Sequence, residues 1–461
     1  RSSASLSSMS GHTQYTWRPC ATWAPTQSGV RVEPMPNYAR AALSFSFDWE
    51  SAMGGLIHSR GGTPVPGESE GGGVVANSDD ISAAINDAVR RGLDMRAGAD
   101  FLLSIFTRFD VKGTFYSTGY NLLDGNTTMQ QFVGNPTYKW ANPQNGWGDN
   151  YWLTHPWYGQ DPFSTDTDPI GKAWYFGDQA DRLHAAGQDI ESHTFGHLYV
   201  RGTTVQEFSA DMDTFLQYAA VKQLPSIRSF AFPWKSSNSL TADWYNVLAQ
   251  RGFTSVTRLY DQDQMVRNLN QGTLQFDNCK RTSDNKVVFE AYAGPCNTYF
   301  YLNRVKNVPQ LAILNDYQLE TGDRSEATAY AVINELLRRR GYGSIWTHPE
   351  SIVAPADQQE WARVVEYATQ QRPAGLYVDS VANVIQYRQD SSQVQVSANW
   401  QDGGKKVTLT VTNHSKDTLN GLTLTLPATI TRSNGAAGFK GSQLLVPTIQ
   451  AGQSLTIDVE F

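Results

Sequence analysis

Two histidines four residues apart form a pair of side chains that could do chemistry. His193 and His197 belong to the segment His-Thr-Phe-Gly-His, directly after a short strand expected at residues 189–192. At a strand-to-helix turn this spacing lets both imidazole rings face one ion, and imidazole nitrogen is a usual ligand of Zn²⁺. Such pairs also occur without a metal, so further ligands must lie nearby in the fold to define a site.

Two carboxylates stand at the end of the first expected strand. Asp48 and Glu50 follow the apolar run at residues 41–47. Side chains two residues apart in an extended chain point to the same side, so both carboxylates can act together. Barrels of alternating strands and helices place their active sites at the carboxyl ends of the strands. For this segment taken alone, an exposed acidic turn is an equally good interpretation.

A third candidate, His348, ends the expected strand at residues 344–347 and precedes Pro349, which breaks regular structure. Imidazole is the side chain best suited to exchange a proton near pH 7. A histidine in a surface loop is the alternative. The position of His348 at a strand end favours the functional interpretation.

Taken in their order along the chain, from residue 46 to residue 348, the three segments resemble the motifs of the polysaccharide deacetylases. This family is also called carbohydrate esterase family 4 or the NodB homology region. Residues 46–50 are similar to the first motif, Ser/Thr-Phe-Asp with a second acid, although Trp49 separates the two acids here. Residues 193–197 match the second motif, His-Ser/Thr-x-x-His, and residues 345–348 resemble the last, an apolar strand ending in Leu-x-His. Residues 113–117 look like the family's second strand.

The resemblance implies a role for each of the five candidates. Glu50, His193 and His197 would bind one divalent metal ion, with Zn²⁺ the first choice and Co²⁺ or Ni²⁺ also suited to these ligands. Asp48 would act as the general base and His348 as the general acid. Asp48 and Glu50 can exchange their roles in similar enzymes. In the third family motif, Ala231 stands where an Arg is usual, so another group must orient the base.

The implied reaction is the removal of acetyl groups from a polysaccharide. Sugars of the N-acetylglucosamine type are the first candidate substrate, and O-acetylated xylan and small cyclic amides are alternatives inside the family. A non-catalytic carbohydrate-binding protein is the alternative outside it, although a decayed site should have lost at least one of the five residues. The expected substrate-binding side chains are Trp49, Phe232, Pro233, Trp234, Trp147 and Trp152.

Alternating strands and helices must position these residues. From about residue 41 to residue 390, short apolar runs alternate with amphipathic helical stretches, which is typical of an α/β domain with a parallel sheet. Gly187, Gly252 and Gly341 each end an expected helix. With the resemblance, this pattern predicts a distorted (β/α) barrel of the polysaccharide deacetylase type, followed by a small C-terminal antiparallel β-sandwich.

The chain is expected to divide into three parts. Residues 1–38 form an N-terminal lead-in segment, and residues 39–390 form the barrel with a Trp-rich insertion at 119–174. The insertion is either functional or a packed cap, since it is too long for an ordinary loop. Residues 391–461 show strict alternation of apolar and polar side chains, which predicts a sandwich of the immunoglobulin or fibronectin kind.

Composition excludes some classes of partner. The net charge is −7 and no long basic run occurs, which argues against nucleic acid. No stretch reaches the ~20 apolar residues that span a bilayer, and we expect a secreted or cell-surface protein. Cys279 and Cys296 either form a disulfide or stay as two thiols. The sequence gives no indication of the oligomeric state.

Overall fold

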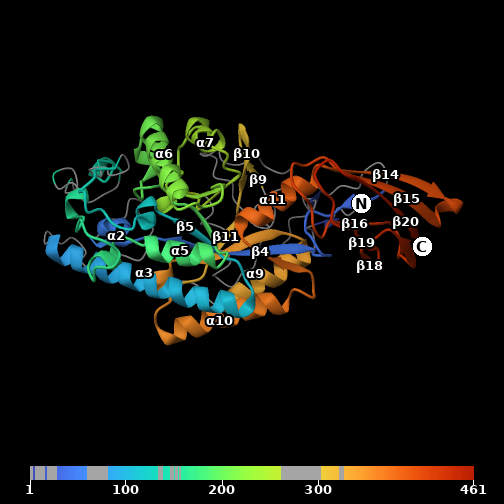
Figure 1. Ribbon diagram of the computed structural model, residues 1–461, viewed down its shortest axis with the longest axis horizontal. Coiled ribbons are helices and arrows are strands. Elements are labelled where there is room, and N and C mark those ends of the chain that lie inside the picture. Colours follow the sequence, from blue (N-terminus) through green and yellow to red (C-terminus); the bar gives the residue numbers. More distant parts are fainter. Residues whose placement is uncertain are drawn as a thin grey trace.

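The computed structural model describes residues 4–5, 16–17, 29–59, 81–132, 139–145, 150, 154, 157–260, 303–320 and 326–461. Two bodies are visible, a large α/β part and a smaller all-β part at one end of the long axis (Figure 1). The Gly-rich segment at 61–73, the three cysteines, Trp147 and Trp152 lie outside the described residues. The expectations for a disulfide and for these two tryptophans therefore remain predictions.

A ten-stranded sheet forms the centre of the α/β part, in the order β11-β12-β4-β5-β6-β7-β8-β10-β9 with β13 beside β4. All pairs in it are parallel except β10 with β9. Its strands are β4 (Ala41–Trp49), β5 (Thr114–Ser117), β6 (Asp189–Ser192), β7 (Ser229–Ala231), β8 (Ser255–Thr257), β9 (Asn303–Val305), β10 (Val308–Ile313), β11 (Asp316–Gln318), β12 (Tyr342–Thr347) and β13 (Leu376–Val378). The predicted α/β class with a parallel sheet is confirmed. Among the described residues the sheet does not close into a complete barrel.

Strand β4 pairs with three other strands of this sheet. Its first residues pair with β13, its last residues pair with β5, and β12 runs along its other edge. All nine residues are buried, but the two faces differ. Phe45 and Phe47 pack against Phe106 and Trp361, whereas Ser44 and Ser46 bond to Tyr342 and Ser344. The strand therefore has an apolar helix-facing side and a polar side on which Asp48 follows.

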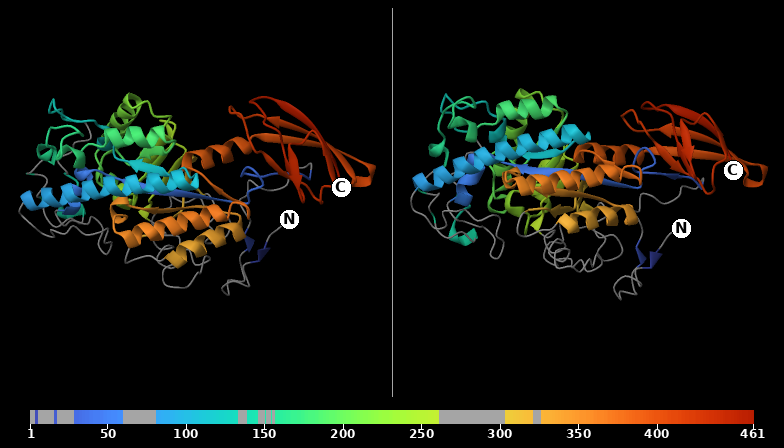
Figure 2. Two further views of the ribbon diagram at one scale, coloured as in Figure 1. Left: turned by 60° about the horizontal axis from the view of Figure 1, so that its bottom comes forward. Right: turned by 90° about the horizontal axis from the view of Figure 1, so that it is seen from below.

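Helices cover the sheet on both sides. Helices α6 and α7 lie on one side, and α9 and α10 lie on the other (Figure 1; two further views in Figure 2). The helices are α2 (Ala52–Ser59), α3 (Ile81–Phe109), α5 (Gly177–Ala185), α6 (Val205–Val221), α7 (Ala242–Ala249), α9 (Glu326–Arg339), α10 (Pro355–Gln370) and α11 (Val381–Ser391). Thr204 and Glu207 form a capping box at the start of α6, a device worth about 1 kcal/mol. No described helix is long and apolar enough to cross a membrane.

The all-β part contains two four-stranded antiparallel sheets, as the alternation predicts. One has the order β14 (Val394–Gln401), β15 (Lys406–Asn413), β20 (Ser454–Glu460), β17 (Arg432–Asn434), and the other has the order β18 (Gly438–Lys440), β19 (Gln443–Leu445), β16 (Thr423–Thr425), β3 (Arg31–Val32). The last of these strands comes from the segment expected to be a lead-in. Val30 is fully buried in the same apolar cluster as Leu409 and Leu424. Residues 30–32 therefore belong to the sandwich in space. A further antiparallel pair, β1 (Ala4–Ser5) and β2 (Thr16–Trp17), lies near the N-terminus.

A buried carboxylate joins separate parts of the described Trp-rich insertion and connects them to Tyr175, directly after it. Asp161 accepts hydrogen bonds from the hydroxyls of Tyr120 and Tyr175 and from the Asn126 amide. Trp140 is 1% exposed and packs on Trp234 at 5.4 Å between ring centroids. For Trp140, the packed-cap interpretation therefore holds. The short 3₁₀ helices η2 (Gly119–Leu122), η3 (Pro143–Asn145), η4 (Trp157–Gln160) and η5 (Gly171–Ala173) also lie in this segment.

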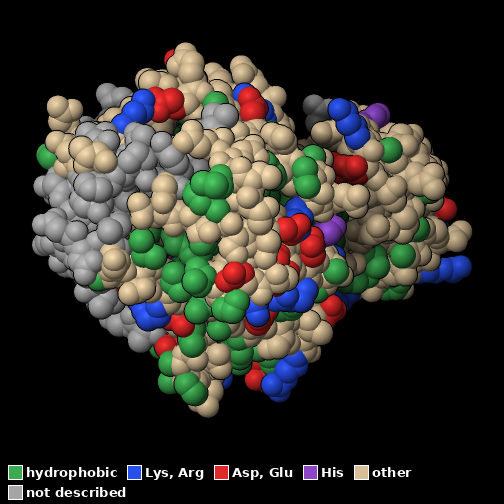
Figure 3. All heavy atoms as spheres, turned by 60° about the vertical axis from the view of Figure 1, so that its left-hand side comes forward, with side chains coloured by type: hydrophobic (Ala, Val, Ile, Leu, Met, Phe, Trp, Pro, Cys, Tyr) green, Lys and Arg blue, Asp and Glu red, His purple; other side chains and the backbone are tan. Residues whose placement is uncertain are grey.

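Charged side chains of both signs are interspersed on the described surface that faces the viewer in Figure 3. Among the described ion pairs, Lys222 contacts both Asp124 and Asp181, at 2.6 and 3.0 Å. This mixture agrees with the modest net negative charge of the sequence.

Candidate metal centre and catalytic cluster

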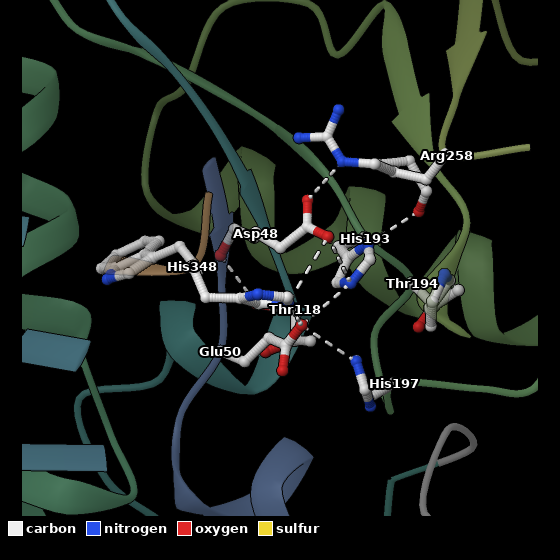
Figure 4. Close-up of polar contacts among 12 residues, drawn as sticks. Asp48, Glu50, Thr118, His193, Thr194, His197, Arg258 and His348 are labelled. Atoms are coloured by element: carbon white, nitrogen blue, oxygen red, sulfur yellow. Dashed lines mark hydrogen bonds and ion pairs between the residues drawn. The ribbon is translucent and has the colours of Figure 1, made fainter. Parts of the chain in front are cut away.

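All five candidate residues meet at the carboxyl end of the parallel sheet. Asp48 and Glu50 come from the end of β4, the two histidines from the turn after β6, and His348 from the end of β12 (Figure 4). The Oε1 atom of Glu50 lies 3.1 Å from the Nε2 atoms of both His193 and His197. Segments that are far apart in the sequence are thus brought within contact distance by the parallel strand order β12-β4-β5-β6.

The ring of His193 is fixed in orientation by a backbone group. Its Nδ1 lies 2.7 Å from the carbonyl oxygen of Ala231, which can only accept a hydrogen bond. Nδ1 therefore carries the proton, and the lone pair of Nε2 faces Glu50 when the ring is neutral. Such a bond to the second ring nitrogen is the usual way in which a protein fixes a metal-binding histidine.

The electrostatics of the cluster favour a positive charge at its centre. Burial raises the pKa of Glu50, but the two histidines lower it well below its usual range. Burial lowers the pKa of His193, and the carboxylates of Asp48 and Glu50 raise it above its usual value overall. Two buried carboxylates around one point thus stabilise a cation there. A divalent ion fits this environment as well as the donor set of two imidazole nitrogens and carboxylate oxygen.

Two groups of side chains have donor atoms close enough to share one ion. Glu50, His193 and His197 form one group, and Asp48, Glu50 and His348 form the other, with donor atoms within 4.8 Å of one another in each. Glu50 is common to both. Its two 3.1 Å contacts to imidazole nitrogens place it, rather than Asp48, at the centre of the histidine group.

Arg258 orients Asp48. The Nε of Arg258 donates to Asp48 Oδ1 at 3.0 Å, while Asp48 Oδ2 lies 3.8 Å from His193 Nε2. Arg258 is fully enclosed: it pairs with Asp316 at 2.7 Å and its guanidinium stacks 3.9 Å from the centre of the Trp346 ring. One carboxylate oxygen is thereby held, and the other is left to face the cluster.

Ala231 stands at the usual arginine position of the third motif, and an arginine from elsewhere in the chain contacts Asp48. This arginine is Arg258, the residue directly after β8. Its backbone is left-handed, with φ of 58°, which turns the side chain back toward β4. The sequence does show an arginine directly after the expected strand at 253–257. The local sequence around this strand gives no indication that Asp48 is the partner of the arginine.

His348 is paired with Glu320, a second residue that sequence reasoning missed. Its Nδ1 lies 2.5 Å from Glu320 Oε1, and its backbone N–H donates to the same oxygen at 3.0 Å. Burial opposes the charged forms, but the pairing raises the pKa of His348 well above its usual value and lowers that of Glu320 to about 2. Nε2 then faces the cluster, 3.9 Å from oxygens of Asp48 and Glu50.

The expected substrate-binding residues are only partly placed at the cluster. Trp49 is a correction: it is fully buried on the helix-facing side of β4, stacks on Phe176 and donates to Gln179. The alternation that points Asp48 inward points Trp49 away. Phe232 is also buried, against Phe230 at 4.9 Å, and does not face the cluster as an open surface.

Trp234 is an expected substrate-binding residue that contacts a candidate ligand. It packs edge-on to the His197 ring at 4.1 Å between centroids and is 4% exposed. It follows the buried Pro233 in the 3₁₀ helix η7 (Pro233–Lys235) and has a left-handed backbone, with φ of 51°. Trp234 thus packs on a candidate metal ligand, and a contact of Trp234 or Pro233 with substrate remains a prediction.

No protein-family model and no curated protein matches the sequence. Solved structures with similar folds include a candidate polysaccharide deacetylase from Mycobacterium smegmatis, with 14% identity, a TM-score of 0.43, and coverage of 77% of this chain and 92% of that one. Puue allantoinase has 14% identity, a TM-score of 0.41 and coverage of 77% and 92%. The carbohydrate deacetylase Agd3 has 13% identity, a TM-score of 0.46 and coverage of 94% of this chain and 66% of its own. At these identities we base the function on the chain's own side chains.

Proposed function

We propose that this protein is a metal-dependent hydrolase that removes acetyl groups from carbohydrates, with N-acetylglucosamine-type sugars as substrate. One observation carries the proposal. Two imidazoles and a carboxylate converge at 3.1 Å, and a second carboxylate and a third imidazole lie within 4 Å of them. Amide and ester hydrolysis require this combination of an electrophilic centre, a base and an acid.

Glu50, His193 and His197 would hold the divalent ion, which we take to be Zn²⁺, with Co²⁺ or Ni²⁺ as alternatives. When bound, such an ion activates water and polarises the carbonyl oxygen of the acetyl group. The short contacts of Glu50 to both histidines support its role as a ligand. All three side chains are buried, so the protein rather than bulk solvent surrounds their donor atoms.

Asp48 would accept the proton of the attacking water. Arg258 holds one of its oxygens, so the other can face the reacting atoms in a fixed geometry. This arrangement supports the assignment of Asp48 as base and Glu50 as ligand over the exchanged roles.

His348 would donate a proton to the departing group. Its bond to Glu320 raises the pKa of His348 well above its usual value, which favours the protonated ring, and directs Nε2 toward the cluster. An amine leaves from a tetrahedral intermediate only after it gains a proton, so an acid of this kind suits N-acetyl substrates. Alkyl acetates need the same help, and O-acetylated xylan is therefore the appropriate comparison substrate.

Acetate release tests the proposal. The purified protein should release acetate from N-acetylglucosamine oligomers, lose this activity in a chelator and regain it when Zn²⁺, Co²⁺ or Ni²⁺ is added. Acetylated xylan measured in parallel distinguishes N-deacetylation from O-deacetylation. Asp48→Asn should leave metal binding in place and abolish acetate release. Binding of the oligomers without any acetate release, with metal loaded, would instead show a non-catalytic carbohydrate-binding protein.

A further inference from the structure

A buried carboxylate outside the cluster holds the turn that carries the two histidines. Asp211, on α6, accepts the backbone N–H of Phe195 at 2.8 Å and that of Gly196 at 3.0 Å, one on each carboxylate oxygen. The residue is 1% exposed. A buried carboxylate is costly unless hydrogen bonds compensate it, so its presence at this position calls for an explanation.

The backbone of this turn is strained on both sides of the bonded residues. Thr194 has φ of 63° and His197 has φ of 55°, a left-handed conformation that costs non-glycine residues about 1 to 2 kcal/mol each. Strained conformations persist only where surrounding contacts fix them. The two hydrogen bonds to Asp211 lie between the two strained residues. A further bond, from Leu198 N–H to the Thr194 hydroxyl at 3.0 Å, closes the turn on itself.

The two histidine rings are fixed in different ways. His193 leaves the end of β6 and its ring is tied directly to the Ala231 carbonyl oxygen. His197 stands at the far end of the turn, and its ring packs against Trp234. The place of the His197 side chain follows from the backbone of residues 194–197, and Asp211 accepts two N–H groups of this backbone.

We propose that Asp211 is a positioning residue for the ion site: by accepting the N–H groups of Phe195 and Gly196, it sets the place of His197 and thereby the affinity for the ion. The inference deepens the proposed function and rests on it. Asp211 is not one of the candidate ligands, and it would act through the two backbone groups that it accepts.

The bonding pattern specifies which substitution tests this role. In Asp211→Asn, the amide oxygen can accept one N–H, but the NH₂ group must face the other donor. The variant keeps the volume of the side chain and removes one of the two ties. Asp213→Asn is the matched control, because Asp213 lies on the same helix, is exposed and pairs with Arg251 at 2.7 Å.

The measurement is the Zn²⁺ dissociation constant of the full-length apoprotein, determined by competition with a fluorescent chelator. His193→Ala gives the background from other zinc-binding groups. Partners of metal ligands typically change metal affinity by ~10- to 100-fold when removed, so Asp211→Asn should raise the dissociation constant by about that factor. Asp213→Asn should stay within about threefold of wild type, because surface substitutions are mostly neutral.

Thermal unfolding of the apoproteins separates positioning from general stability. A purely structural role would lower the melting temperature and leave the affinity of the folded fraction unchanged. Asp211→Glu keeps both acceptor oxygens and should bind Zn²⁺ more tightly than Asp211→Asn. Equal Zn²⁺ affinity of wild type and a folded Asp211→Asn would overturn the inference. Failure of both Asp211 variants to fold would also overturn it, because Asp211 would then be a folding determinant. If wild type itself binds no Zn²⁺ above the His193→Ala background, the proposed function fails instead.

Discussion

At the scale of single residues, three of the groups proposed to act are held by a partner of opposite charge or by the backbone. Arg258 holds Asp48, Glu320 holds His348, and the Ala231 carbonyl oxygen holds His193. These contacts fix the rotamers and leave one functional atom of each side chain free to face the cluster. Pre-organisation of this kind lowers the cost of orienting groups during the reaction.

The proposed acid role of His348 predicts a dependence on the leaving group. In His348→Ala, hydrolysis of N-acetyl sugars should lose ~10²- to 10⁴-fold in kcat, the usual contribution of general acid catalysis. Hydrolysis of an aryl acetate should lose far less, because a phenolate departs without a proton. The metal content should stay as in wild type. Equal losses on both substrates would contradict the acid role, and loss of the ion would make His348 a ligand.

The pairing of His348 with Glu320 predicts a change in the pH profile. The carboxylate raises the pKa of His348, so the acid stays protonated to higher pH and activity falls as the pH rises through that pKa. A nearby opposite charge shifts a pKa by ~1 to 3 units. In Glu320→Gln, the alkaline limb of kcat/KM for the N-acetyl substrate should therefore move to lower pH by about one unit or more.

The same shift has a consequence for stability. A histidine whose pKa is raised by folding stabilises the folded state fully below its unfolded pKa, and this contribution is lost as the pH rises through the folded pKa. Wild type should lose stability relative to Glu320→Gln as the pH increases from about 6.5 upward. Unfolding in denaturant at several pH values measures this difference. The coupling would be excluded if Glu320→Gln kept the wild-type alkaline limb and if the difference in unfolding free energy between the two proteins did not vary with pH.

At the scale of secondary-structure elements, close helix packing sets the loop that follows His348. Gly98 of α3 lies against Pro349 so tightly that an added Cβ would stand 1.7 Å from the Pro349 carbonyl oxygen. Gly→Ala in a helix normally stabilises by about 1 kcal/mol. Here the backbone of the 3₁₀ helix η9 (Pro349–Ser351) must move instead.

Gly98→Ala should therefore lower the melting temperature and displace His348. Activity on N-acetyl sugars should fall more than activity on an aryl acetate, because the proposed acid is the group that moves. Gly55→Ala on α2 is the matched control, since its added Cβ would meet its nearest neighbour, Arg91, at an ordinary 3.5 Å. Wild-type stability in Gly98→Ala would show that η9 adapts without cost.

At the scale of the whole molecule, the sandwich is joined to the α/β part through both ends of the latter. Strand β3 precedes β4 in the chain and pairs with β16 of the sandwich. Helix α11 leads into β14, and Gln386 of α11 bonds to Asp417 of the sandwich at 3.2 Å. None of the five cluster residues comes from the sandwich.

Truncation tests how far the two parts are independent. Removal of residues 391–461 alone should leave Val30 and Val32 without their apolar partners and lower the melting temperature. Removal of residues 1–33 in addition should recover solubility, since no strand is then left unpaired. Both proteins, if folded, should retain activity on a small acetylated substrate. A folded but inactive truncated protein would show that the sandwich shapes the site.

The sequence by itself determined the α/β class and the antiparallel sandwich, because both depend on local periodicity, while the family resemblance of three motifs singled out the five cluster residues. Periodicity of apolar residues specifies strands and helices, and the spacing of Asp48 with Glu50 and of His193 with His197 specifies which side chains share a face or a turn. The tertiary structure alone decided the partners. Arg258, Glu320 and Asp211 act on residues that are distant in sequence, and β3 joins a sheet formed by the other end of the chain. Pairing over such separations depends on strand order and packing, which the local pattern does not encode.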